Sequence, residues 1–320
     1  MARSKITNWS LNIDKLRVCL NITDETYNYL SETYTRLETI TENKKEITIR
    51  HLDEDDFSLV FYDEDEKEMF ASLIISDYKN EKIKLGTFHF NNTKKYKNKA
   101  FFVFENCALY RPFTVNTDGT RNSWIFALLY VADFYGMEFN NITELELAFD
   151  SDFNFVKKVR SLIKNVDKYD LYLNGRKVES DDEILKGYGE YYSRNRLKLQ
   201  EPTLYFSQAK DTDLSMRMYN KGKELEENSP QKTNRYKEWN NWSNYDTIYR
   251  VEIVFHNTNV RDFFTRNINR LNDEINNHDN VLNLIGIEKV RMLMFLDACD
   301  RLIYFRDKKS KEKLSLIDLA

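Results

Sequence analysis

Hydrophobic and polar residues alternate along the first third of the chain with the two-residue period of β-strands. Turns rich in charged residues or Asn separate most of the alternating runs, which are 13–21, 46–51, 57–62, 70–77, 82–90 and 100–105. A helical period covers 22–41, with Thr23 or Asp24 as its expected N-cap. This part therefore predicts a strand, a helix and then an antiparallel meander.

The rest of the chain mixes helical and strand periods. An aromatic and aliphatic run at 123–136 ends at a glycine, as helices commonly do. Further helices are expected at 153–165, 221–240, 258–276 and 280–305, and strands at 142–150, 169–173, 203–207, 213–219 and 247–255.

These elements predict an α+β fold, with a largely antiparallel central sheet flanked by helices. The order of elements in the second half loosely follows that of the first, which suggests two pseudo-repeated halves, although the sequence itself does not repeat. We expect an N-terminal α+β half at 1–115, a catalytic α+β half at 116–260 and a C-terminal helical segment at 261–320.

Composition indicates a globular protein. The 320 residues are 41% hydrophobic and include only 3 Pro and 8 Gly, which argues against disorder and long flexible linkers. The 3 cysteines are far apart and show no metal-binding spacing, which favours buried thiols in a reducing cytosol. The start of the chain has no apolar signal region, and the most apolar segment, 124–135, is interrupted by Asp133, so we expect a cytoplasmic protein without a membrane span.

The formal net charge is -4, from 48 Lys and Arg against 52 Asp and Glu. A nucleic-acid-binding protein of this charge needs locally concentrated cations, because phosphate neutralisation supplies much of its affinity. Basic clusters occur at 157–164, 193–198, 217–223, 232–237 and 306–313. One such cluster alone is more often a solvated face than a binding site.

Carboxylates lie inside two otherwise apolar strands. Glu146, Ala148 and Asp150 share one face of the 142–150 strand, and Glu252 lies in the middle of 247–255. A buried carboxylate needs a partner, and for Glu252 we expect either Arg250 or a cation that bridges to the first strand. Such oxygens suit a divalent metal, Mg²⁺ or Mn²⁺. The alternative is carboxylates that are exposed on a half-wet sheet.

Tyr219 ends the 213–219 strand and is followed by basic residues. Arg217 shares its strand face, and Lys221 and Lys223 come directly after it. A phenol with an ordinary pKa near 10 needs positive charge or metal nearby to act as a nucleophile. The guanidinium and the lysines could hold a phosphate. The alternative is that Tyr219 packs, as most of the 20 tyrosines are expected to do.

Three runs of the sequence together resemble the replication initiators of small rolling-circle plasmids, the trans-acting Rep type with a single catalytic tyrosine. They are ELELAFD at 144–150, LYFSQAKDTDLSMRMYNKGKE at 204–224 and YRVEIVFHN at 249–257, and the resemblance covers about 120–260. The order and spacing of the runs are similar, but Glu146 stands where an aspartate is usual and Gly222 where a lysine is usual. The His-hydrophobic-His metal motif of the larger relaxase and Rep superfamily is absent, since the 4 histidines are scattered, and this agrees with a carboxylate-based site.

The resemblance implies that Tyr219 is a nicking nucleophile assisted by Arg217 and Lys221. It implies a carboxylate metal site made of Asp150, Glu252 and Glu146. We expect Lys223 and Asn220 to contact DNA near the nick. Origin recognition would fall in 258–285, through Arg261, Arg266 and Arg270.

The expected function is that of a DNA nicking-closing enzyme that initiates rolling-circle replication of a plasmid. Its partners would be plasmid origin DNA, a host helicase and polymerase, and a second copy in a homodimer. The sequence contains no P-loop, so unwinding would depend on the host. Three alternatives remain open: a conjugative relaxase that nicks a transfer origin, an initiator or repressor that binds its sites without cutting, and a protein-interaction domain without DNA affinity, with which the acidic net charge is consistent.

Overall fold

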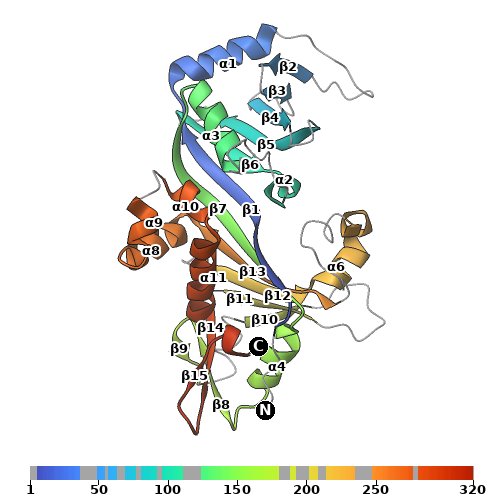
Figure 1. Cartoon of the computed structure of the whole chain (residues 1–320), viewed down its shortest axis with the longest axis vertical. Helices are drawn as coiled ribbons and strands as arrows, with labels where there is room; N and C mark the ends of the chain where they lie inside the picture. The colour runs from blue at the N-terminus through green and yellow to red at the C-terminus, as the bar shows by residue number, and fades with distance from the viewer. Residues whose placement is uncertain are drawn as a thin grey trace. The chain divides into compact units, whose positions relative to one another are not determined.

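The computed structural model divides the chain into two compact units. Residues 6–36, 49–54, 57–62, 69–76, 81–91, 96–110, 124–179, 188–191, 202–207, 214–234, 247–276 and 280–319 are described. Unit 1 consists of Met1–Ile13, Glu146–Asn277 and Leu284–Ala320, and unit 2 of Asp14–Leu145 and His278–Asn283. Two of the boundaries fall inside long strands, so β1 (Trp9–Asn21) and β7 (Glu138–Ser151) belong partly to each unit. Figure 1 shows these two strands side by side.

Unit 2 is built around an antiparallel meander, as the alternating sequence predicts. Its strands follow the order β7-β1-β6-β5-β4-β3-β2. The strands that follow β1 are β2 (Ile49–Asp53), β3 (Phe57–Tyr62), β4 (Met69–Ser76), β5 (Lys82–Asn91) and β6 (Lys99–Phe104). The helices of the unit are α1 (Asp24–Arg36), α2 (Asn106–Tyr110) and α3 (Trp124–Phe134). The hydroxyl of Thr23 accepts a hydrogen bond from the Thr26 backbone N–H and so caps α1, as expected.

Aromatic side chains make up much of the core of unit 2. Phe88 on β5 and Phe102 on β6 are fully buried, and their ring centroids lie 4.6 Å apart. Helix α3 packs against the sheet through Phe134, whose ring meets the edge of Phe57 on β3 at 5.5 Å. Each buried aromatic ring of this size stabilises the fold by about 1.5–3 kcal/mol relative to an exposed position.

Unit 1 contains a second run of the sheet, in the order β10-β11-β12-β13-β7-β1. Its strands after β7 are β10 (Tyr188–Tyr191), β11 (Thr203–Ser207), β12 (Ser215–Asn220) and β13 (Tyr249–His256). The helices are α4 (Phe155–Ile163), α6 (Lys221–Asn228), α8 (Asn257–Asn267), α9 (Asn272–Asn276) and α11 (Glu288–Leu302), with the short 3-10 turns η1 (Pro230–Lys232) and η3 (Ile317–Leu319). Helix α10 (Val281–Ile285) is divided between the two units. The sequence predicts all of these strands except β10.

The two faces of this sheet differ in chemistry. One face is apolar and buried, and its side chains include Leu145, Leu147, Phe149, Met216, Met218, Val251 and Ile253. Phe149 stacks on Phe295 of α11 with ring centroids 5.1 Å apart, so this helix covers the apolar face. Because neighbouring residues of a strand point to opposite faces, the side chains of Glu146, Asp150 and Glu252 must lie on the other face.

A separate four-stranded sheet completes unit 1, in the order β15-β14-β8-β9. It consists of β8 (Tyr169–Leu173), β9 (Arg176–Lys177), β14 (Ile303–Asp307) and β15 (Lys313–Leu314). The predicted helix at 280–305 was wrong at its end, because α11 stops at Leu302 and the chain continues as β14. Ile303 and Phe305 are buried on one face of β14 and Tyr304 points to the other, which is a strand period.

The fold class is confirmed, since the structure has a large antiparallel sheet flanked by helices. The predicted segments 1–115, 116–260 and 261–320 cut the chain at other places than the two units do. Sequence patterns mark the ends of elements, whereas the units change within β1 and β7. Among the described residues, no helix is long and apolar enough to cross a membrane.

The three cysteines are free thiols in different surroundings. Cys19 and Cys299 are buried, and burial raises the pKa of both, whereas Cys107 is partly exposed. The thiolate is the reactive form, so we expect a thiol reagent at pH 8 to label Cys107 first in the folded protein. Counting modified cysteines by mass spectrometry, with and without urea, checks this. Equal labelling of all three in the folded protein would contradict the burial.

Candidate active site on the polar sheet face

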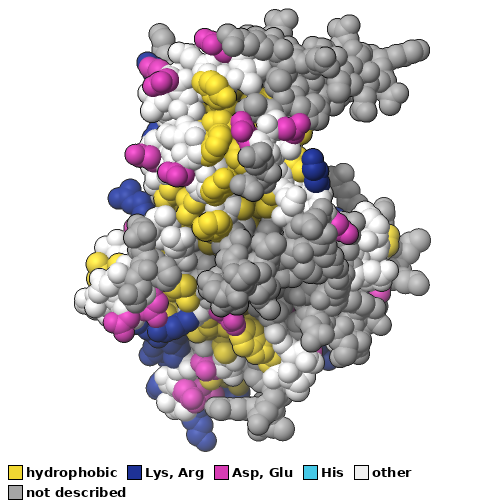
Figure 2. All heavy atoms as spheres, turned by 45° about the horizontal axis from the view of Figure 1, so that its top comes forward, with side chains coloured by type: hydrophobic (Ala, Val, Ile, Leu, Met, Phe, Trp, Pro, Cys, Tyr) yellow, Lys and Arg dark blue, Asp and Glu magenta, His cyan; other side chains and the backbone are white. Residues whose placement is uncertain are grey.

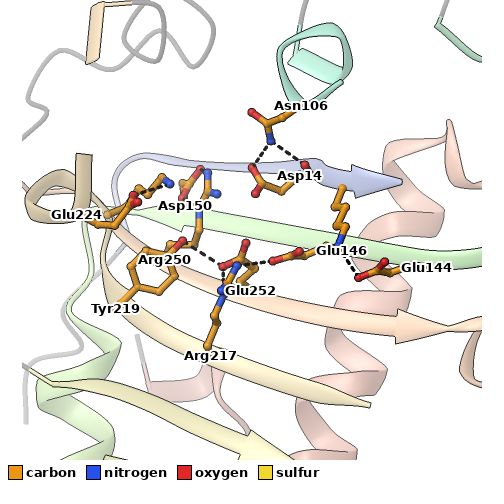
Figure 3. Close-up of polar contacts among 12 residues, drawn as sticks. Asp14, Asn106, Glu144, Glu146, Asp150, Arg217, Tyr219, Glu224, Arg250 and Glu252 are labelled. Atoms are coloured by element: carbon orange, nitrogen blue, oxygen red, sulfur yellow. Dashed lines mark hydrogen bonds and ion pairs between the residues drawn. The ribbon is translucent and has the colours of Figure 1, made fainter. Parts of the chain in front are cut away.

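The polar face of unit 1 brings a tyrosine, two arginines and three carboxylates onto three neighbouring strands. Strand β12 supplies Arg217 and Tyr219, and β13 supplies Arg250 and Glu252. In the register of these strands, Arg217 lies opposite Glu252 and Tyr219 lies opposite Arg250. The remaining carboxylates, Glu146 and Asp150, come from β7, the strand beside β13. Figure 3 shows the side chains pointing toward one another above the strands.

Arg217 links two of the carboxylates. Its Nε donates a hydrogen bond to Glu252 Oε2, and its Nη2 donates one of 2.7 Å to Glu146 Oε1. Burial lowers the pKa of Arg217, but the hydrogen bond to Glu252 and the nearby carboxylates outweigh this effect, so the net pKa is raised above its ordinary value. The guanidinium therefore stays charged at any pH at which the protein is folded.

Tyr219 is held by the same carboxylate. Its hydroxyl donates a hydrogen bond of 3.0 Å to Glu252 Oε2, the oxygen that Arg217 also contacts. The guanidinium carbon of Arg217 and the ammonium of Lys221 each lie 5.8 Å from the centre of the Tyr219 ring. The phenol thus has an acceptor for its proton and two cations beside it, which is the environment that a tyrosine nucleophile requires.

Asp150 is in a different environment. It is 0% exposed, and Arg250 contacts both of its carboxylate oxygens, at 2.7 Å from Nε and 2.9 Å from Nη2. The sequence offered two partners for Glu252, either Arg250 or a cation that bridges to the first strand, and Arg217 is such a cation because it contacts both Glu252 and Glu146 of β7. Arg250 pairs with Asp150, and Glu252 pairs with Arg217 from the next strand. The spacing of Arg250 and Glu252 placed both on one face, but only the strand order determines which carboxylate each cation meets.

Strand β12 ends at Asn220, directly after Tyr219, and helix α6 begins at the next residue. The Asn220 side chain caps the helix by accepting a hydrogen bond from the Lys223 N–H at 3.0 Å. The N–H groups of Lys221 and Gly222 both donate to the Ile248 carbonyl. The N–H groups of Lys221, Gly222 and Lys223 in the first turn are therefore all hydrogen-bonded within the protein. The Asn220 amide, a predicted DNA contact, has a structural role here.

The two lysines of this turn differ in exposure. Lys221 is mostly buried, and its ammonium contacts Glu224 Oε2 at 2.7 Å, while Lys223 is exposed. Lys221 is thus fixed near the tyrosine ring, and Lys223 can reach a ligand in solvent. Glu224, to which the sequence assigns no role, orients Lys221.

The three arginines predicted to read the origin follow β13. Arg261 is exposed on α8, and Arg266 forms a two-point ion pair with Asp297 of α11 at 2.9 and 3.0 Å. The hydrogen bond that Arg266 donates to Asp297 raises the pKa of Arg266. Arg270 lines a hollow of about 380 Å³ together with Asp297 and other residues of the C-terminal part. None of the contacts described for these arginines involves the tyrosine site.

The glutamates of the site fit a hard divalent cation. Glu146 and Glu252 each offer a carboxylate oxygen, and these oxygens lie within 4.8 Å of each other. Mg²⁺ is commonly held by one or two carboxylates with water and substrate phosphates as its other ligands. Arg217 contacts one oxygen of each of these glutamates, whereas Arg250 contacts both oxygens of Asp150, so Asp150 could join them only if its ion pair opened. Figure 3 also draws Asp14 of unit 2, whose carboxylate accepts hydrogen bonds from Asn106 at 3.1 Å and Tyr110 at 2.5 Å.

The fold and this site define an α+β protein with a tyrosine, guanidinium and carboxylate cluster on an antiparallel sheet. No protein-family model and no curated protein matches the chain. Among solved structures it is similar to a rolling circle replication initiator protein from Geobacillus stearothermophilus. That likeness has a TM-score of 0.42 and 13% sequence identity, and it covers 95% of this chain and 89% of the other.

Proposed function

We propose that this protein is a replication initiator of the rolling-circle type, which cuts and rejoins one strand of its origin DNA. The observation that supports this most directly is the hydrogen bond from the Tyr219 hydroxyl to Glu252, with Arg217 and Lys221 beside the ring. Tyrosine is a weak nucleophile by itself, and these groups supply the proton acceptor and the positive charge that it needs.

In the proposed reaction, the Tyr219 oxygen attacks the phosphorus of one phosphodiester. Its proton passes to Glu252, a phosphotyrosyl bond forms at the 5′ end, and the bond to the 3′ oxygen breaks. The released 3′ oxygen takes up a proton and becomes a hydroxyl that a polymerase can extend. The covalent link conserves the phosphodiester energy, so the strand can be rejoined without ATP.

The other cations and carboxylates of the site have different roles in the proposed reaction. Arg217 and Lys221 stabilise the negative charge that develops on the phosphoryl oxygens, and the exposed Lys223 holds the backbone beside the cut. A bound Mg²⁺ or Mn²⁺ at Glu146 and Glu252 would polarise the phosphodiester and neutralise part of its charge. Asp150 and Arg250 fix the strands that carry these groups. Arg261, Arg266 and Arg270 are proposed to contact origin DNA.

Removal of divalent metal is expected to stop the reaction. Purified protein mixed with a supercoiled plasmid that carries its gene and flanking DNA should give relaxed and nicked circles with Mg²⁺ or Mn²⁺. It should give none with excess EDTA, because Glu146 and Glu252 would have no cation to hold at the phosphate. A denaturing gel should show protein linked to the 5′ end. Tight binding without cleavage under any metal would overturn the proposal in favour of an initiator that does not cut.

A further inference from the structure

The small sheet of unit 1 has one apolar face and one basic, aromatic face. Ile303 and Phe305 of β14 and Leu173 of β8 are buried on the first face. On the second face, the register places Tyr304 opposite Tyr172, and Arg306 between Asp170 and Lys313. Neither the cluster around Tyr219 nor the reaction proposed for it uses this second face.

Cations on this face lie against aromatic rings. Tyr172 and Tyr304 are stacked with centroids 4.5 Å apart and planes inclined by 12°. The guanidinium of Arg306 lies 5.6 Å from the Tyr172 ring, and the ammonium of Lys313 lies 4.6 Å from the Tyr304 ring. The buried Nε of Arg306 has no hydrogen-bond partner within the described residues. The rings therefore help to hold the two cations in place. Lys313 also pairs with Asp300 at 2.7 Å, and Lys308 lies 3.7 Å from Asp170, but both lysines remain partly exposed to a ligand.

The turn between β14 and β15 presents more cations. Lys308, Lys309 and Lys311 are all exposed there. The Asp307 carboxylate accepts hydrogen bonds of 2.8 Å from the backbone N–H groups of both Lys309 and Ser310, which lowers the pKa of Asp307. Since these bonds order the turn, the lysine side chains extend from a fixed backbone.

The charge of this hairpin is opposite to that of the chain. Residues 303–314 carry five Lys and Arg against two Asp and Glu, whereas the whole protein has a net charge of -4. Figure 1 shows β14 and β15 in its lower part, and the lower part of Figure 2 shows Lys and Arg side chains together with some Asp and Glu. We call Tyr172, Tyr304, Arg306, Lys308, Lys309, Lys311 and Lys313 the hairpin surface.

We propose that the hairpin surface binds the phosphate backbone of duplex DNA without reading its sequence. The two tyrosine rings stack on each other and lie under cations, so they are not open to stack on bases. The exposed tip at 308–311 offers lysine and serine, and the exposed Glu312 follows it. Such a surface matches phosphates, which position a protein on DNA but carry no sequence information. The choice of DNA as the polyanion rests on the proposed function. A lipid surface is less favoured, because the tip has no apolar side chain to insert.

The salt dependence of duplex binding tests this inference. Binding of the full chain to a 30-base-pair duplex of arbitrary sequence would be measured by fluorescence anisotropy at several KCl concentrations. The triple variant Lys308→Gln/Lys309→Gln/Lys311→Gln should bind at least about tenfold more weakly at low salt. Its slope of log affinity against log salt should be shallower by up to about 2.7, which is about 0.9 for each lost phosphate contact.

A matched variant controls for net charge. Lys82→Gln/Lys84→Gln/Lys97→Gln removes the same charge from unit 2 and should leave the affinity within about twofold of the wild type and the slope unchanged. Equal slopes for the two triple variants would overturn the inference. The inference would also be overturned if the hairpin variant kept its duplex affinity but lost binding to vesicles of phosphatidylserine and phosphatidylcholine, because the surface would then bind lipid. If the wild type binds duplex through the hairpin surface but never cuts, the proposed function fails and this surface stands.

Discussion

Replacing Tyr219 with phenylalanine is expected to abolish strand cleavage while leaving the fold intact. The change removes only the hydroxyl and with it the hydrogen bond to Glu252, and Arg217 continues to contact that carboxylate. Stability should therefore fall by no more than about 1.5 kcal/mol. Cleavage should fall by about four to six orders of magnitude, as when a nucleophile is removed from other covalent enzymes. Quantifying nicked plasmid and the protein-linked 5′ end on a denaturing gel measures this.

The matched control is Tyr205→Phe. Tyr205 lies on β11 directly opposite Arg217 in the register and is 40% exposed, so its phenol is the same chemical group one strand away. This variant should cut at close to the wild-type rate. If Tyr205→Phe loses cleavage and Tyr219→Phe retains it, the nucleophile has been assigned to the wrong strand.

Replacing Arg250 with methionine is expected to destabilise the fold far more than either tyrosine substitution. The Arg250 side chain is 1% exposed and Asp150 is 0% exposed, so the variant leaves a carboxylate buried without its guanidinium. Breaking such a pair from one side typically destabilises a protein by about 3–5 kcal/mol. Urea unfolding followed by circular dichroism would measure the loss as a lower midpoint with little change in slope.

The double variant Asp150→Val/Arg250→Met separates the charge effect from packing. Exchanging a buried ion pair for apolar side chains of similar volume is often neutral, so the double variant should recover most of the stability lost by Arg250→Met. A double variant that is less stable than Arg250→Met alone would show that these two side chains do not act as a pair. Cleavage by the double variant would also show whether Asp150 is needed as a metal ligand.

The sequence was enough to predict the strands that form the site, but not which of its charged side chains pair with each other. Alternation placed Arg217 and Tyr219 on one face, and the structure confirms this through β12. The partners of Arg217 and Arg250 depend on which strands are neighbours and on their register, and both come from residues far apart in the chain. The ion pair between Asp150 and Arg250, separated by 100 positions, could not be predicted from local patterns.

The errors in the C-terminal part have a similar cause. Apolar residues recur at helical spacing along most of the segment 288–305, and Ile303 and Phe305 were therefore predicted to belong to the same helix. A short apolar run is equally compatible with a strand, and the hydrogen-bonded pairing of β14 with β8 stabilises the strand here. Strand β10 was not predicted because its four residues, one of them a glycine, are too few to show an alternating pattern.

The direct passage from β12 into α6 restricts how the length of this segment can vary. Tyr219 is aligned by strand pairing on one side, and on the other side Asn220 begins the helix with no intervening loop. One residue inserted or deleted within β12 would rotate the tyrosine to the apolar face and detach the cap from its helix. Natural variation in such a protein can therefore exchange side chains here, but insertions and deletions will be confined to the connections outside the strand and helix.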